Sequence, residues 1–214
     1  MSNVASVISG ITRSLAPFIE SAPDRPPAVT GSAVPGRDIS TRTGMPRRYR
    51  AQWERPTDAV WEDLFSGIMG RIRDGGIIAL IGQRGTGKTR MAAEAMRDFA
   101  REHGDYTTAM GLFLRIRASY ARNSDESEKE IVTSMTKTRL LVLDEVQERG
   151  NTAWEDRLLT HILDSRYGAM SPTILIANLT ESALVNCLGD SIISRLEETG
   201  GIIEISGPSH RTQP

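Results

Sequence analysis

One eight-residue segment limits the folds available to this chain more than any other part of its sequence. Residues 82–89 read Gly-Gln-Arg-Gly-Thr-Gly-Lys-Thr, the pattern of a phosphate-binding loop whose glycines let backbone N–H groups turn toward phosphates. The apolar run Ile77–Ile81 precedes the segment, and an amphipathic helical pattern follows it. Because a strand, a loop and a helix occur in the required order, the pattern indicates a phosphate-binding loop rather than a chance glycine-rich turn.

The same segment carries side chains suited to a nucleoside triphosphate. Lys88 would place a positive charge at the β- and γ-phosphates, and Thr89 would offer its hydroxyl to Mg²⁺. The N-terminus of the following helix adds a partial positive charge. We therefore predict ATP and Mg²⁺ as ligands. The predicted nucleotide-binding residues of the loop are Gly82, Gln83, Arg84, Gly85, Thr86, Gly87, Lys88 and Thr89.

Apolar runs alternate with helical patterns over most of the chain after residue 45. Continuously apolar strands separated by helices are typical of a parallel sheet that is covered by helices on both faces. We therefore predict an α/β fold. The predicted strands are Ile77–Ile81, Met110–Ile116, Leu140–Leu143, Thr173–Ala177 and Ile202–Ile205.

Two of these strands end in polar residues that suit ATP hydrolysis. Asp144 and Glu145 follow Leu140–Leu143; we expect Asp144 to hold Mg²⁺ together with Thr89, and Glu145 to orient or deprotonate the attacking water. A protein that only stores nucleotide has no need of the second carboxylate, so the pair favours an ATPase. Asn178 follows Thr173–Ala177 and would contact the γ-phosphate and the water, although an asparagine at a strand end is also a common turn residue.

Two arginines near the end of the chain, Arg195 and Arg211, are candidates for stabilising the charge of the reaction. Such an arginine is worth about 10³–10⁵ in rate in phosphoryl transfer. An exposed arginine is ordinarily only a solubilising charge. Periodicity alone places neither residue in the site.

The N-terminal region has a different organisation. Within residues 3–19 the apolar side chains recur at steps of three and four, which predicts an amphipathic helix. Residues 21–46 contain five prolines and three glycines, which predicts an extended linker. We therefore divide the chain into a partner-docking helix (1–20), a flexible linker (21–45) and an ATPase domain (46–214). Packing of the helix onto its own domain is the alternative, and membrane lodging is disfavoured because its only basic residue is Arg13.

Composition excludes several classes of partner and site. The formal net charge is −1, so contact with nucleic acid requires a local patch or several assembled copies. The single cysteine, Cys187, excludes an internal disulfide and a cysteine-rich zinc site. No apolar run approaches the roughly 18 residues of a membrane span, and the N-terminus does not resemble a secretory signal. We predict a cytoplasmic protein without membrane contact.

The order of the motifs resembles the AAA+ ATPases, in particular the DnaC-type helicase loaders and the related IstB transposition helpers. The resemblance covers about residues 45–212. It rests on the segments Met45–Arg50, Gly82–Thr89, Leu140–Glu145, Asp164–Tyr167, Pro172–Asn178, Leu188–Asp190, Ser194–Leu196 and Ser209–Arg211.

The resemblance implies a five-stranded parallel sheet of order 5-1-4-3-2 with no C-terminal lid domain. It implies that Arg195 acts in trans on the ATP of a neighbouring subunit, and that Arg211 contacts ATP in its own subunit. The family usually has tyrosine where this chain has His210. The implied function is an ATP-dependent loader of a replicative helicase: the N-terminal region binds the hexameric helicase, and the ATPase domains form a homo-oligomer around single-stranded DNA.

The DNA-contacting residues are the least visible part of the sequence. In the resembling proteins the second strand and the following helix face the DNA, and the polar residues of this region are Arg115, Arg117, Tyr120, Arg122 and Lys137. A solvated basic face is the alternative interpretation. Two other functions stay open, namely an IstB-like transposition helper and a nucleotide-gated adaptor with little turnover.

Overall fold

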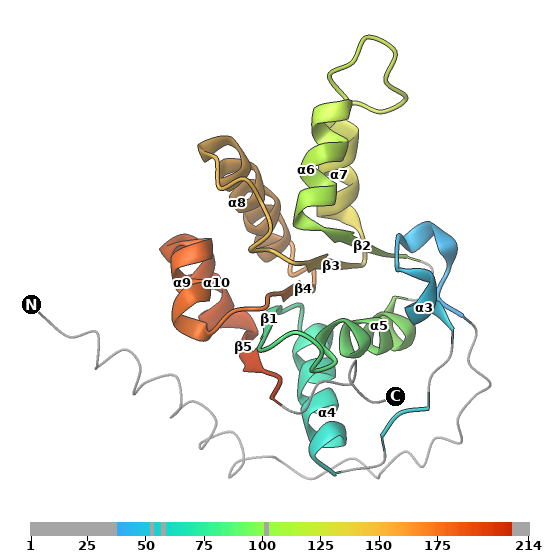
Figure 1. Cartoon of the computed structure of the whole chain (residues 1–214), viewed down its shortest axis with the longest axis vertical. Coiled ribbons are helices and arrows are strands. Elements are labelled where there is room, and N and C mark those ends of the chain that lie inside the picture. The colour runs from blue at the N-terminus through green and yellow to red at the C-terminus, as the bar shows by residue number, and fades with distance from the viewer. Residues whose placement is uncertain (1–37, 52–53, 57–58, 101–102, 207–214) are drawn as a thin grey trace, which may run out of the picture. The chain divides into compact units, whose positions relative to one another are not determined.

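The computed structural model describes residues 38–51, 54–56, 59–100 and 103–206 (Figure 1). The predicted docking helix (1–20), most of the predicted linker and Arg211 lie outside the described residues, so their assignments remain predictions. Among the helices that are described, none is long and apolar enough to cross a membrane.

A five-stranded parallel sheet forms the centre of the domain (Figure 1). Its strands are β1 (Ile77–Ile81), β2 (Gly104–Thr108), β3 (Leu140–Asp144), β4 (Thr173–Ile176) and β5 (Gly201–Glu204). They pair in the order β2-β3-β4-β1-β5, which confirms the predicted α/β fold and strand order. The three central strands are buried along their whole length, as continuously apolar strands covered on both faces should be.

Helices cover both faces of the sheet (Figure 1). The elements outside the sheet are η1 (Thr41–Thr43), α3 (Arg47–Arg50), α4 (Ala59–Arg73), α5 (Lys88–Phe99), α6 (Ala109–Ala118), α7 (Glu128–Lys137), α8 (Ala153–Gly168), α9 (Glu181–Leu188) and α10 (Asp190–Thr199). Alternate strand residues point to opposite faces: Ile78 and Leu80 pack with α4 and α5, whereas Ile77 and Ala79 pack with α6 to α10. The sheet therefore has two hydrophobic cores.

The prediction of a strand at Met110–Ile116 was wrong, because this segment lies in α6. Its buried side chains Leu112, Phe113 and Ile116 are spaced as one helical face, and the Thr108 hydroxyl accepts a hydrogen bond from the Gly111 N–H at the helix start. The true strand, β2, precedes it and reads Gly-Asp-Tyr-Thr-Thr. As an edge strand that is only partly buried, β2 has no apolar run by which its sequence could reveal it.

Residues 38–45, which the predicted division placed in the linker, pack on the domain. Ile39 and Met45 are each only 2% exposed and belong to the core between the sheet and α5. Gly44 has a φ of 72°, and a Cβ there would lie 2.4 Å from the Tyr106 carbonyl oxygen. This segment therefore passes close along β2, where only glycine fits.

Candidate nucleotide-binding site

The loop between β1 and α5 has the backbone conformation of a phosphate cradle. Gly82, Gly85 and Gly87 have φ values of 127°, 91° and 96°, which side chains of L-residues rarely tolerate. At Gly82 there is also no room for a side chain, because a Cβ would lie 2.4 Å from the Ile205 carbonyl oxygen of the chain leaving β5. The backbone conformation thus favours glycine at all three positions, and at Gly82 the packing requires it as well.

Lys88, the first residue of α5, is folded back over the loop. Its side chain is buried, and Nζ donates hydrogen bonds to the carbonyl oxygens of Gly82 at 2.8 Å and Gln83 at 2.7 Å. The ammonium group therefore lies beside the N-terminus of α5, where a phosphate group is favoured. Arg84, Gly85 and Thr86 line the adjoining cavity, whereas Gly82 and Gln83 contribute their carbonyls to Lys88 instead.

A buried carboxylate joins α5 to two strands. Asp144 is 5% exposed, and its Oδ2 accepts hydrogen bonds from the Thr89 hydroxyl and the Tyr106 hydroxyl, each at 2.9 Å. Its Oδ1 accepts one from the Glu145 N–H at 2.7 Å. Burial, and next the negative charge of Asp144, raise the pKa of Tyr106 well above its ordinary value, so its hydroxyl remains a donor at neutral pH.

Sequence reasoning missed Tyr106 as a site residue because β2 was not recognised. With β2 in place, the register pairs Tyr106 with Val142 and Thr108 with Asp144. A tyrosine two residues before the end of an edge strand therefore reaches the carboxylate at the end of its neighbour.

The donor set around Asp144 fits Mg²⁺. Magnesium prefers oxygen ligands, and it is held by one or two carboxylates with substrate phosphates rather than by a protein cage. Thr89 and Asp144 supply a hydroxyl and a carboxylate within 2.9 Å of each other. In the described part of the chain no group of three His, Cys, Asp or Glu residues could hold a metal ion.

Glu145 and Asn178 lie at the same edge of the sheet. Both line one cavity of about 750 Å³ together with Lys88, Thr89 and Asp144, a volume within the range of small-molecule sites. Glu145 has a φ of 53°, an uncommon conformation for a residue with a side chain and one that recurs at functional sites. The Asn178 N–H donates to Gln147 Oε1 at 3.2 Å.

One part of the cavity lining is apolar and aromatic. It is formed by Pro46, Tyr49, Pro56, Val60, Trp61 and Leu64. The guanidinium groups of Arg48 and Arg90 lie over the Tyr49 ring, at 4.7 and 4.9 Å from its centroid. None of these residues was predicted from the sequence to belong to the site.

Arg195 lies on α10 and is not among the residues that line the cavity. Its Nε is 2.8 Å from Asp164 Oδ1 of α8, its guanidinium lies 5.5 Å from the centroid of the Tyr167 ring, and it donates to the Ser191 hydroxyl at 2.7 Å. Its side chain is 25% exposed. The structure therefore does not bring Arg195 together with the predicted nucleotide-binding residues of its own chain.

Arg166, on α8 next to Tyr167, is buried, unlike Arg195. It is 0% exposed, and its guanidinium donates to the Thr173 hydroxyl at 2.7 Å and to the carbonyls of Met135, Thr138 and Pro172 at 2.8, 3.0 and 2.6 Å. Burial lowers the pKa of Arg166 to about 10, which leaves it charged at neutral pH. Arg166 thus joins the end of α7 to the start of β4 as a structural residue.

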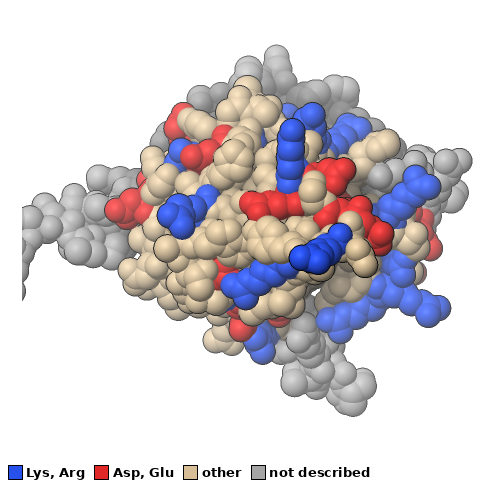
Figure 2. Space-filling model, turned by 90° about the horizontal axis from the view of Figure 1, so that it is seen from above, with Lys and Arg blue, Asp and Glu red and all other residues tan. Residues whose placement is uncertain are grey.

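The basic residues proposed for DNA contact are partly neutralised. Arg115 pairs with Glu126, Arg117 with Glu155, and the Tyr120 hydroxyl donates to Glu128. Figure 2 shows Lys and Arg side chains next to Asp and Glu over the face seen from above, rather than one continuous basic patch. These residues lie on α6 and in the turn after it, and Lys137 ends α7.

Comparison with known proteins identifies relatives of this domain. The family model of the IstB-like ATP binding proteins matches residues 68–214. The replicative helicase loader DnaC of Escherichia coli K12 is 25% identical over 126 residues, which are 58% of this chain and 51% of that protein. The chain thus spans about half the length of the curated relatives it matches.

Solved structures show the same fold. The crystal structure of the DnaC helicase loader superposes with a TM-score of 0.61 at 19% identity, covering 75% of this chain and 100% of that one. DnaA of Aquifex aeolicus bound to AMPPCP superposes with a TM-score of 0.58 at 19% identity, covering 78% of this chain and 53% of that one. At this level of identity the likeness is one of fold.

Proposed function

The chain belongs to the IstB-like ATP binding proteins, a DnaC-like branch of the AAA+ class, and from this premise we propose that it hydrolyses Mg²⁺-bound ATP to load a replicative helicase onto single-stranded DNA. One observation carries the proposal: Lys88, Thr89, Asp144, Glu145 and Asn178 line a single cavity. The cavity thus has groups for phosphate, metal and water at one edge of the sheet.

The phosphate groups of ATP would lie on the glycine loop. The backbone N–H groups of the loop and the N-terminus of α5 favour their negative charge. Lys88 would exchange its two carbonyl acceptors for the β- and γ-phosphates, since Nζ already lies over the loop. The apolar and aromatic wall that includes Tyr49 and Trp61 offers a surface for the base.

Thr89 and Asp144 are the proposed metal-binding residues. When bound, Mg²⁺ would neutralise part of the charge on the phosphates. The bonds from Tyr106 and the Glu145 N–H to Asp144 fix the carboxylate in place before any ligand arrives. A fixed carboxylate costs less reorganisation at the moment of reaction.

Hydrolysis would proceed by attack of a water oxygen on the γ-phosphorus. The bond to the β–γ bridging oxygen breaks, ADP leaves, and the proton of the water passes to Glu145. Asn178 would hold the γ-phosphate and the water by its amide. Arg195 would stabilise the developing charge from a neighbouring copy, and Arg211 would contact ATP in its own copy.

Helicase loading also requires partners. The DnaC proteins that match this chain are named replicative helicase loaders. We propose that residues 1–20 bind a hexameric replicative helicase, and that the ATPase domains assemble around single-stranded DNA, cytoplasmically and without membrane contact. The basic residues of α6 would contribute to DNA contact only in an assembly, because their carboxylate partners reduce the charge of one copy.

A second candidate function is that of a transposition helper of the IstB kind. The family match, which is described as IstB-like, favours it. A loader should co-purify with a hexameric helicase and respond to single-stranded DNA. A helper should instead bind a transposase and duplex DNA.

The test of the ATPase proposal uses two variants of the full chain. Lys88→Ala should weaken ATP binding by about a hundredfold or more, because two charged hydrogen bonds to phosphate are lost. Glu145→Gln should retain binding while turnover falls by about 10²–10⁴. Equilibrium binding of a fluorescent ATP analogue and steady-state phosphate release measure the two effects.

Lys137→Ala is a matched control for the lysine, since Lys137 is exposed at the end of α7 and lines no part of this cavity. It should bind ATP as the wild type does. Wild-type protein that hydrolyses no ATP even with helicase and single-stranded DNA present would exclude the enzyme and leave a nucleotide-gated adaptor.

A further inference from the structure

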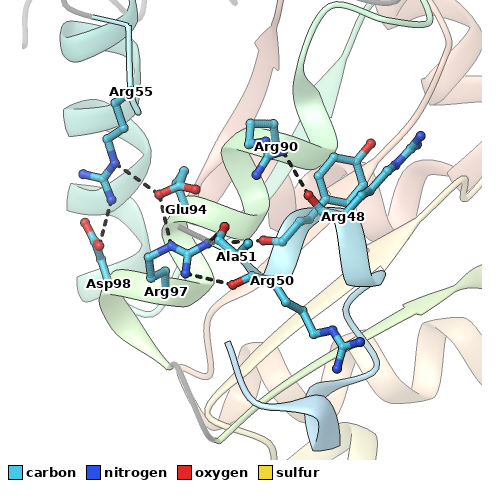
Figure 3. A network of polar contacts seen from close by, with 9 residues as sticks. Arg48, Arg50, Ala51, Arg55, Arg90, Glu94, Arg97 and Asp98 are labelled. Atoms are coloured by element: carbon cyan, nitrogen blue, oxygen red, sulfur yellow. Dashed lines mark hydrogen bonds and ion pairs between the residues drawn. The ribbon is translucent and has the colours of Figure 1, made fainter. Parts of the chain in front are cut away.

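We infer that Arg97 and Glu94, on the second and third turns of α5, are positioning residues that build the base-side wall of the nucleotide cavity. They do so by bonding the backbone of residues 49–51 and the side chain of Arg55 to α5 (Figure 3). The inference rests on the proposed function, because it concerns how the same cavity holds ATP. Neither residue lines the cavity, and no sequence motif pointed to either.

Arg97 closes the end of a very short helix. Its Nη1 donates to the Arg50 carbonyl at 3.1 Å, and its Nη2 donates to the carbonyls of Tyr49 at 3.2 Å and Ala51 at 2.8 Å. These carbonyls belong to α3 (Arg47–Arg50) and the residue after it, where a helix leaves its last acceptors without partners. A four-residue helix is too short to be stable alone, so its conformation here depends on such external donors.

Glu94 supplies the opposite charge that allows Arg97 to be buried. The two side chains are 2% and 5% exposed, and Arg97 Nε lies 3.3 Å from Glu94 Oε2. The same oxygen accepts from Arg55 Nε at 3.3 Å, and Arg55 Nη2 also pairs with Asp98 at 2.8 Å. Figure 3 shows Arg55 and Arg97 converging on Glu94 from two different segments. Glu94 thus pairs with Arg55 directly and with residues 49–51 through Arg97.

The other end of this network reaches α4. The Arg55 guanidinium lies 4.5 Å from the centroid of the Phe65 ring and 5.8 Å from that of Trp61. Pro46, Arg48, Tyr49 and Pro56 of the fixed segment line the cavity, as does Trp61. Residues that hold this segment therefore set the position of this part of the cavity lining.

Glu94 and Arg97 themselves lie away from the glycine loop, whereas Arg90, next to Thr89, contacts Arg48 and Tyr49 of this wall. Lys88 and Thr89 begin α5, whereas Glu94 and Arg97 lie farther along the same helix and bond to a segment remote in sequence. A change at Arg97 should therefore affect contact with the base and ribose, and leave the phosphate contacts intact. Binding of ATP and binding of inorganic tripolyphosphate can be compared to separate the base and ribose contacts from the phosphate contacts, because tripolyphosphate has neither base nor ribose.

The main test variant is Arg97→Lys, which keeps the buried charge opposite Glu94 but cannot bond three carbonyls as a planar fork does. We expect ATP binding to weaken about tenfold while tripolyphosphate binding changes by less than about twofold. Glu94→Gln should likewise weaken ATP binding more than tripolyphosphate binding. Arg157→Lys, at an exposed position of α8, is the matched control and should leave both ligands unaffected.

Limited trypsin digestion gives a second, binding-independent measurement. Cleavage after Arg47, Arg48 and Arg50 should be slow in the wild type and slowed further by ATP. In Arg97→Lys it should be at least about fivefold faster without ligand, because the segment opens more often. Thermal unfolding of each variant shows that the domain remains folded during these measurements.

The outcomes separate the inference from the proposed function. If the wild type binds neither ATP nor tripolyphosphate, the proposed function fails and the inference fails with it. If the wild type binds both and Arg97→Lys matches it in ATP affinity and digestion, only the inference is overturned. Equal losses for ATP and tripolyphosphate would also overturn it, since the residue would then act through the glycine loop.

Discussion

The phosphate end of the cavity and the α8–α10 surface that carries Arg195 are organised in opposite ways. At the cavity, Thr89 of α5, Tyr106 of β2 and Asp144 of β3 meet within hydrogen-bond distance, and Asp144 is buried. On α10, Arg195 is partly exposed and is held by Asp164 and Tyr167 of α8. The first region is assembled within one chain, whereas Arg195 does not line the cavity that the first region forms.

This difference gives the proposed assembly a physical basis. A group that must act on ATP but does not line the cavity of its own chain can serve only the cavity of another copy. Under the proposed function, nucleotide binding is therefore a property of one subunit and rapid turnover a property of two. Four predictions test or refine the contrast.

The largest effect is expected at Arg195. Arg195→Ala should leave ATP affinity unchanged within about twofold, while turnover falls by about 10³ or more, because the arginine acts on charge that develops during the reaction. Mixing this variant with Lys88→Ala should restore part of the activity, since each supplies what the other lacks. Phosphate release from the two proteins, alone and mixed, measures the effect; a parallel loss of ATP binding would contradict the contrast.

Arg166, two residues after Asp164, should affect the stability of the domain, whereas Arg195 should affect turnover. Arg166→Met would leave the carbonyls of Met135, Thr138 and Pro172 without this donor, and we expect the free energy of unfolding to fall by about 3 kcal/mol. Arg157→Met, at an exposed site of the same helix, should change it by less than about 0.5 kcal/mol. Urea unfolding measures both. A stable Arg166→Met protein with lowered turnover would make Arg166 part of the functional surface instead.

The residues at the glycine-loop end of the cavity could be predicted from the sequence, because they occur in two short segments with recognisable patterns. The glycines and Lys88 of the loop occur in one run, and Asp144 and Glu145 follow a buried strand directly. The central strands were also predictable, because strands buried on both faces are continuously apolar. The parallel order of the sheet then brings their carboxyl ends to one edge.

The rest of the site depends on contacts that leave no local pattern. β2 escaped recognition because an edge strand needs few apolar residues, and Tyr106 was missed with it. The carbonyls that Arg97 and Arg166 bind belong to the backbone, which every residue shares, so no residue type marks them. Ile39 and Met45 stand in a proline- and glycine-rich stretch, and only the fold shows that they are buried.

Tyr106 offers a smaller test at the phosphate end. Tyr106→Phe removes one of the donors to Asp144 Oδ2 and keeps the ring, so we expect the Mg²⁺ concentration for half-maximal hydrolysis to rise about fivefold. Affinity for ATP without metal should be unchanged. A titration of turnover against Mg²⁺ measures the effect. A lower Mg²⁺ requirement would show that the hydroxyl competes with the metal instead of fixing the carboxylate.

The smallest effect is expected at Asp164. This carboxylate pairs with Arg195 of the same chain. An exposed ion pair contributes about 0.2–1 kcal/mol, so Asp164→Asn should release Arg195 and raise turnover by at most about fivefold at protein concentrations that limit assembly. Because salt screens exposed charges, the variant and the wild type should converge as ionic strength rises. Phosphate release at low and high salt tests this, with Glu197→Gln, at an exposed position of α10, as the carboxylate control. If Asp164→Asn lowers turnover at every salt concentration, Asp164 orients Arg195 for the reaction, and the α8–α10 surface is preassembled like the cavity.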